Sequence, residues 1–124
     1  MCPDMVKEII SQYRTLQGEY DMRTALYSDQ TLDGEALILN RKLAVIEAWL
    51  RLLNEEERFV VQKHLVDQLP WPLLMVEYER QWGPSQARHN RTLKRFQSRA
   101  LEKIAMKIEK WKMVSEIEKL FQLQ

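Results

Sequence analysis

The feature that most constrains this chain is the spacing of apolar residues within residues 84–112, PSQARHNRTLKRFQSRALEKIAMKIEKWK. Apolar residues recur there every three or four positions, which is the period of one helix face: Leu93, Phe96, Ala100, Ile104, Ile108 and Trp111. The same spacing continues further on, at Val114, Ile117, Leu120 and Phe121. We therefore expect one long helix that runs almost to residue 124. Its start lies between Ser85 and Asn90, either of which would cap it.

The same segment concentrates positive charge. It carries a net charge of +7, whereas the whole chain carries +1, so the other residues sum to −6. Such segregation indicates a surface with a function of its own. The nine cations of the segment are Arg88, Arg91, Lys94, Arg95, Arg99, Lys103, Lys107, Lys110 and Lys112, against Glu102 and Glu109.

The remaining sequence also favours helices. Three glycines and four prolines among 124 residues suit long helices with short breaks better than a turn-rich β fold. We predict an all-α fold with helices at 4–27, 35–52, 55–68 and 72–81 and a loop at 28–34. Apolar stripes give each of the first three helices a buried face: Val6, Ile9, Ile10, Tyr13, Leu16, Tyr20 and Tyr27; Leu37, Leu39, Leu43, Ile46, Trp49, Leu50 and Leu53; and Phe59, Val60, Leu65 and Val66.

Helix starts are marked by polar residues and by proline. Asp4 can cap the first helix, and Pro72 suits the first turn of the fourth. Asn54 is a good N-cap, and Glu57 stands three residues later, as in a capping box. We therefore place a division at this point, with an N-terminal helical region for packing or oligomerisation at 1–53 and a second region at 54–124.

Several classes of protein are disfavoured by the sequence. No apolar run approaches the ~20 residues of a membrane span, and the start MCPDMVKE lacks the pattern of a secretory signal. A single cysteine, Cys2, suits a reducing cytosol. We therefore expect a cytoplasmic protein without a membrane association.

Catalytic chemistry also lacks a sequence signature. Cys2, His64 and His89 do not have metal-ligand spacing, and His64 is expected to be a partly buried helical residue. The chain has no glycine-rich phosphate loop and no local signature of a nucleophile with its base. We expect no catalytic residues, no metal, no cofactor and no enzymatic activity.

Of the classes of function considered, nucleic-acid binding is the one that the sequence favours. The helices at 55–68 and 72–81 followed by the basic helix form the order of a helix-turn-helix with a supporting helix, in which the last helix reads a groove of duplex DNA. Arginine and lysine contact phosphates and guanine, and asparagine can read adenine. The expected DNA-binding residues are Arg88, His89, Asn90, Arg91, Thr92, Lys94, Arg95, Ser98 and Arg99, with Arg91, Thr92, Lys94 and Arg95 nearest the DNA.

Residues 53–105 resemble region four of bacterial primary-type sigma factors. An "L-x-x-x-E-R-x-V" helix is matched by Leu53, Glu57, Arg58 and Val60, and Trp71 matches the aromatic residue that opens the next helix. The reading helix, which ends in "R-A-L-x-K-L", is matched by Thr92, Lys94, Arg95, Arg99, Ala100, Leu101, Lys103 and Ile104. The chain departs from the pattern at Met75, where a small residue is usual, in the longer turn 83–88, and at His89, where serine is common.

The whole layout is similar to small phage regulators of the ArpU and RinA type. The resemblance implies a phage or prophage activator of late genes that works in the bacterial host near RNA polymerase. The chain lacks the sigma regions that melt promoter DNA, so it is not a full sigma factor. The expected partners are double-stranded DNA, RNA polymerase and a second copy in a homodimer.

Two alternatives stay open at this stage. One is a protein–protein adaptor whose N-terminal helices and tail stripe dock on polymerase or on a second copy of the chain; the stripe is Ile108, Trp111, Val114, Ile117 and Phe121. The other is the small subunit of a phage terminase, which also uses a helix-turn-helix. Assembly into a ring would favour the terminase subunit, and a dimer would count against it.

Overall fold

A computed structural model describes residues 1–27, 34–86 and 88–122. Within these ranges every regular element is helical, so the predicted all-α class is confirmed. The elements are α1 (Pro3–Ile10), α2 (Tyr13–Leu26), α3 (Gly34–Leu50), α4 (Glu55–Val61), the π-helical η1 (Gln62–Val66), α5 (Trp71–Trp82), the 3-10 turn η2 (Pro84–Gln86), α6 (Asn90–Lys110) and α7 (Val114–Phe121). Residues 28–33 of the predicted loop lie outside the described ranges. No described helix is long and apolar enough to cross a membrane.

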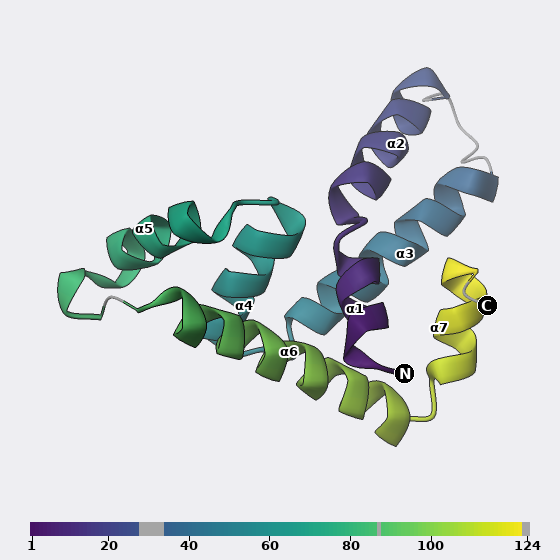
Figure 1. Ribbon diagram of the computed structural model, residues 1–124. Helices are drawn as coiled ribbons and strands as arrows, with labels where there is room; N and C mark the ends of the chain where they lie inside the picture. The colour runs from purple at the N-terminus through teal and green to yellow at the C-terminus, as the bar shows by residue number, and fades with distance from the viewer. Residues whose placement is uncertain (28–33, 87, 123–124) are drawn as a thin grey trace.

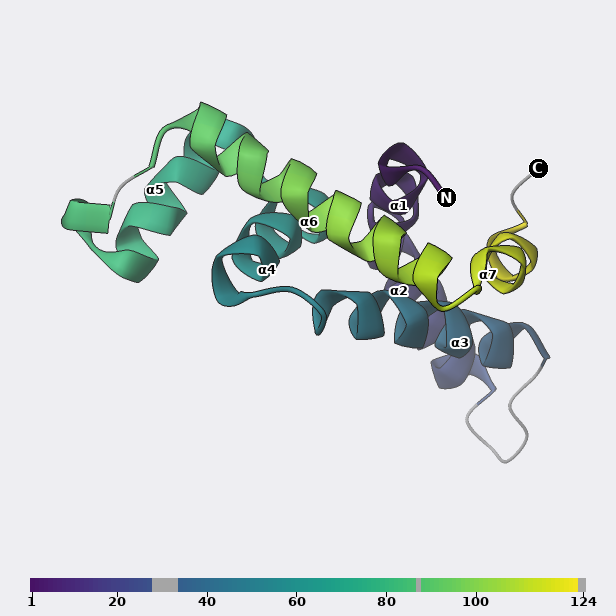
Figure 2. The same ribbon diagram turned by 90° about the horizontal axis from the view of Figure 1, so that it is seen from below.

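The 21-residue helix α6 spans the molecule, and the other helices are arranged along it (Figure 1). At its N-terminal end it lies beside α4 and α5. Helix α1 packs against its second half, and α7 lies beyond its C-terminal end (Figure 2). Helices α2 and α3 pack against each other and project away from α6.

Most buried apolar residues form one group, here called the main core. It joins α1, α2, α3, the end of α4 with η1, the second half of α6, and α7, so it includes residues from both sides of the predicted division between 53 and 54. Its fully buried members include Ile9, Ile46, Val61, Ala100 and Ile104. The second half of α6 is thus anchored by the N-terminal helices.

A smaller group, here called the aromatic cluster, holds α5. Its buried members are Val60, Leu74, Tyr78 and Leu93, and Phe59, Trp71, Trp82 and Phe96 pack around them. The Phe59 ring lies edge-on to the Trp82 ring with centroids 4.8 Å apart, and Tyr78 and Trp82 lie 4.4 Å apart. Such ring pairs add stability beyond their buried area. Helix α5 is attached to α4 and to the first half of α6 through these rings.

The single helix predicted at 4–27 is wrong, because the chain forms α1 and α2 with a turn at Ser11 and Gln12. The Ser11 hydroxyl donates to the Lys7 carbonyl at 2.8 Å, and the Gln12 amide donates to the Ile9 carbonyl at 3.1 Å. The Gln12 bond reaches back three residues instead of four, which tightens the chain at the end of α1. The turn lets α1 pack on α6 while α2 packs on α3.

The expectation that the basic helix continues almost to residue 124 is also wrong. Helix α6 ends at Lys110, and Lys112 has a left-handed backbone with φ of 55°. The amide of Met113 donates to the Ile108 carbonyl at 3.0 Å, which satisfies a carbonyl at the helix end. Helix α7 then turns back on α3, where Phe121 stacks 6.5 Å from Trp49.

Three of the other expected helices differ at their ends, and the one at 55–68 also changes from α-helix to π-helix at Gln62. The helix expected at 35–52 ends at Leu50, the one at 55–68 ends with η1 at Val66, and the one at 72–81 spans Trp71–Trp82. The buried stripes are mostly confirmed. The exceptions are Tyr27, Leu37 and Trp111, which are 57%, 48% and 48% exposed, and six half-buried residues: Tyr13, Tyr20, Phe59, Phe96, Val114 and Leu120.

The predicted caps had mixed outcomes. The capping box is confirmed, since the Glu57 amide donates to Asn54 at 2.8 Å and the Asn54 amide donates to Glu57 at 3.1 Å. Asp4 does not cap α1, because Cys2 holds the N-cap position and Asp4 lies in the first turn. Neither Ser85 nor Asn90 caps α6. The N-cap residue is His89, whose side chain makes no capping bond.

Candidate nucleic-acid interface

One side of the first half of α6 presents exposed polar and cationic side chains, here called the cationic face: Arg91, Lys94, Arg95, Ser98 and Arg99. They recur at intervals of three and four, so they lie along one side of the helix. The opposite side is fixed in the interior, where Leu93 and Ala100 are fully buried. Helix α6 therefore cannot rotate about its axis without exposing this apolar side. The cations are held facing outward.

Lys94 is placed by the first residue of α5. Its ammonium nitrogen lies 5.8 Å from the centre of the Trp71 ring, within the range of a cation–π contact. The Trp71 ring also stacks on the His64 ring, with centroids 3.8 Å apart and planes 27° apart. An aromatic stack from η1 and α5 thus supports a cation of α6.

His64 is tied to the buried side of α6. Its Nδ1 lies 2.7 Å from Oε1 of Gln97, which is only 6% exposed. An amide oxygen only accepts hydrogen bonds, so Nδ1 carries the proton and donates. Burial lowers the pKa of His64, and the positive charges of Lys7 and Lys94 lower it further, while the bond to Gln97 acts in the opposite direction. His64 is the half-buried helical residue that the sequence predicts.

Arg88 faces inward rather than outward. It is half-buried and hydrogen-bonded to the hydroxyl of Tyr78, which itself donates to Glu56 at 2.5 Å. Burial and the Glu56 carboxylate raise the pKa of Tyr78 to about 12, and Arg88 partly offsets this rise. These contacts fasten the segment before α6 to α4 and α5. Arg88 thus supports the start of α6.

The other predicted site residues at the helix start differ in exposure. His89 is exposed, whereas Asn90 and Thr92 are half-buried. The side-chain oxygen of Asn90 is buried and has no hydrogen-bond partner. Of the nine predicted residues, Arg91, Lys94, Arg95, Ser98 and Arg99 form the cationic face, His89 lies just before it, and Arg88, Asn90 and Thr92 are withdrawn from it.

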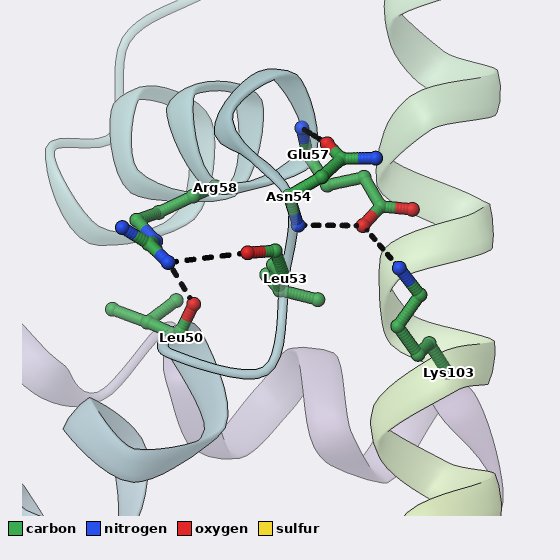
Figure 3. Close-up of polar contacts among 6 residues, drawn as sticks. All are labelled: Leu50, Leu53, Asn54, Glu57, Arg58 and Lys103. Carbon is green, nitrogen blue, oxygen red and sulfur yellow. Dashed lines mark hydrogen bonds and ion pairs between the residues drawn. The ribbon is translucent and has the colours of Figure 1, made fainter.

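In the second half of α6, Lys103 is engaged inside the protein (Figure 3). Its ammonium group lies 2.6 Å from Oε1 of Glu57, whose side chain is 2% exposed. The same carboxylate oxygen accepts from the Asn54 amide. The capping box of α4 and the middle of α6 are therefore joined by a largely buried ion pair.

Arg58 supports the preceding helix end. Its guanidinium donates to the carbonyls of Leu50 and Leu53 at 3.0 and 3.1 Å (Figure 3). The Leu50 carbonyl also accepts from the Leu53 amide at 3.2 Å, so Arg58 adds a second bond to the turn that ends α3. Each matched position of the "L-x-x-x-E-R-x-V" pattern has a structural role here, since Leu53 and Val60 are buried in the two apolar groups. The pattern indicates how the supporting helix is held.

Sequence reasoning missed the partners of Lys94 and Lys103. The cap at Asn54 and Glu57 is visible locally, but Lys103 is separated from Glu57 by 46 residues. Trp71 was noted only as a match to a resemblance, and Gln97 was not noted. A polar residue on the apolar side of an amphipathic helix is the signal that would have identified Gln97, because a buried amide requires a partner.

Comparisons of the chain with family models, with curated proteins and with solved structures gave no match. Among the described residues, no group of three or more histidine, cysteine, aspartate or glutamate side chains lies close enough to hold a metal ion.

Proposed function

We propose that the chain is a sequence-specific DNA-binding transcriptional regulator, in which α4, α5 and α6 act as a helix-turn-helix and α6 reads the major groove. The observation that carries the proposal is the cationic face, whose four cations point outward while the opposite side of the same turns is buried. A helix in the major groove needs this separation of faces. The activity is binding rather than catalysis.

The roles within the face follow from side-chain chemistry. Arg95 lies midway along it and can donate two hydrogen bonds to guanine. Arg91, Lys94 and Arg99 lie around it and suit phosphate contacts, and Ser98 can bond to either. Thr92 is half-buried, so it offers less surface to DNA than Arg91, Lys94 or Arg95.

The biological setting rests on resemblance. Residues 53–105 are similar to sigma region four, and the layout is similar to ArpU- and RinA-type phage regulators. On this ground we propose a phage or prophage late-gene activator that acts beside RNA polymerase in the host cytoplasm. A homodimer would read two half-sites about one helical turn apart, which is ~34 Å.

The first test is selection of bound DNA from a random duplex pool, followed by measurement of affinity against salt. Three phosphate-contacting cations in each bound copy of the chain predict a slope of log K against log salt of about −3 per copy. A slope near zero, or selection without any enriched sequence, contradicts the proposal.

The second test replaces one cation of the face. Arg95→Ala should weaken binding to the selected site by about 5- to 150-fold, because a base contact contributes roughly 1–3 kcal/mol. Lys110→Ala is the matched control, since Lys110 is an exposed cation at the other end of the same helix. Equal losses for the two variants would show that only overall charge matters.

A further inference from the structure

An apolar groove lies at the end of the molecule away from the cationic face, between α3, the end of α6, and α7. Its deep part has a volume of about 290 Å³ and opens onto a shallower part of about 760 Å³. The apolar residues that line it include Val45, Trp49, Leu52, Trp111, Met113 and Ile117. Trp49 and Ile117 are buried, whereas Trp111 and Met113 are each 48% exposed.

The two exposed residues are held in place by the turn between α6 and α7. The Trp111 and Met113 amides donate to the carbonyls of Lys107 and Ile108, at 2.9 and 3.0 Å. The ammonium group of Lys107 lies 5.5 Å from the Trp111 ring centre. The backbone therefore holds two large apolar side chains at the surface, and Lys107 also contacts the ring of the first. A preformed surface of this kind lowers the entropic cost of binding.

The shape of the groove suits a helix. One wall is formed by Arg41, Val45 and Ala48 of α3 and by Leu52 just beyond it, at intervals of three and four residues. This stripe extends about 16 Å, or three helical turns. Ile117 and Leu120 form the facing wall on α7. The apolar part of the α3 wall, from Val45 to Leu52, covers about 10 Å, or two helical turns, and a partner helix whose own apolar residues recur at the same spacing can pack along it.

The charges around the groove favour a partner of opposite, negative charge. The lining includes the cations Arg41, Lys107, Lys112 and Lys119, against the single acid Glu116. Acidic residues beside the apolar stripe of a partner would face these cations. We propose that the groove binds an acidic amphipathic helix of another protein. This does not rest on DNA binding, because Trp111 and Arg95 are separated by 16 residues of helix, about 24 Å.

The test is selection from a displayed library of helical peptides of about 16 residues, using the full chain. The expected products have apolar residues spaced by three and four and a net negative charge. The best peptide is then measured by fluorescence anisotropy against variants. Met113→Ser should weaken it at least about tenfold through lost apolar contact, and Lys119→Glu about three- to tenfold through charge. Arg95→Ala, on the cationic face, should leave its affinity unchanged.

Several outcomes overturn the proposal. Enriched peptides that are neutral or basic, or that bind Met113→Ser as well as the original chain, would exclude this groove or this partner chemistry. If duplex DNA displaces the peptide, the cations that line the groove bind DNA phosphates rather than an acidic helix. Sedimentation that finds a dimer, which Met113→Ser dissociates, would assign the groove to a second copy of the chain.

Discussion

The two halves of α6 carry similar numbers of cations but use them differently. In residues 90–99 the cations Arg91, Lys94, Arg95 and Arg99 are exposed, and the side behind them packs partly on the aromatic cluster. In residues 100–110, Lys103 is paired with Glu57 and Lys107 lies over Trp111, so Lys110 is the one exposed cation of this half, while the apolar side enters the main core. Positive charge along a helix therefore does not by itself define a binding surface.

What separates the two halves is the surroundings of each cation. A cation with an acidic partner in the interior contributes to the fold, and one directed to water remains available to a ligand. The comparison can be tested by replacing a cation or an aromatic contact in each half, and by changing residues outside α6 that hold its first half in place.

The largest effect is expected from Lys103→Met. It leaves the Glu57 carboxylate buried without its counter-ion, which should cost about 3 kcal/mol in the free energy of unfolding. Arg99→Met, one turn earlier on the exposed side, should change stability by less than about 0.5 kcal/mol. Urea denaturation followed by circular dichroism measures both. Equal losses would mean that the ion pair does not distinguish the halves.

A smaller effect is expected at the connection before α6. Gly83 ends α5 with φ of 92°, where a side chain is strained, so Gly83→Ala should lower the free energy of unfolding by about 1–2 kcal/mol. Gly18→Ala is the matched control. Gly18 lies within α2 with open space around its Cα, so alanine should raise stability by roughly 0.5–1 kcal/mol. A gain at both sites would contradict the strain at Gly83.

The ring contacts give a third comparison, at the level of DNA affinity. Trp71→Leu removes the ring beneath Lys94 and should weaken DNA binding about two- to fivefold, the size of a cation–π contact. Trp111→Leu removes the corresponding ring beside Lys107 in the second half. That variant should leave DNA affinity unchanged. Both affinities are measured by titrating a fluorescently labelled DNA duplex with each variant. A loss with Trp111→Leu would extend the DNA interface to the second half.

The smallest effect is the pH dependence carried by His64. Its pKa in the folded chain is lowered by burial, so the unfolded chain binds the proton more readily. Stability from neutral His64 is present above about pH 6.5, the ordinary histidine pKa, and is lost as the pH falls through the lower folded value. His64→Gln should therefore lose less stability than the original chain between pH 7.5 and pH 5. An identical loss would exclude His64 as the cause.

Periodicity predicted which residues are buried better than where helices end. Val6 and Leu16 keep one stripe across the turn at Ser11 and Gln12, and Ile108 and Ile117 keep another across the turn at Lys112. Both pairs enter the main core on either side of a break. A common core imposes the same apolar spacing on successive helices. The spacing therefore shows which residues are buried, but it does not show whether they belong to one unbroken helix.

The candidate site was predicted as a set of residues but not in its internal order. The cations at 91–99 were identified from the sequence because charge and helical spacing are local properties. The inward position of Arg88 depends on Tyr78 and Glu56, and that of Lys103 depends on Glu57. These partners come from other helices, so only the packed structure identifies which cations remain exposed.

The unbroken course of α6 has a consequence for geometry. The helix has 21 residues, so it is a rod of about 30 Å whose two ends belong to different surfaces. A protein held in the groove would sit at a fixed distance and a fixed rotational angle from the bound base pairs. Insertion of one residue in α6 would turn one surface relative to the other by about 100°, and insertion of a whole turn would mainly lengthen the spacing. The length of helix α6 would then set both the distance and the angle between the two bound partners.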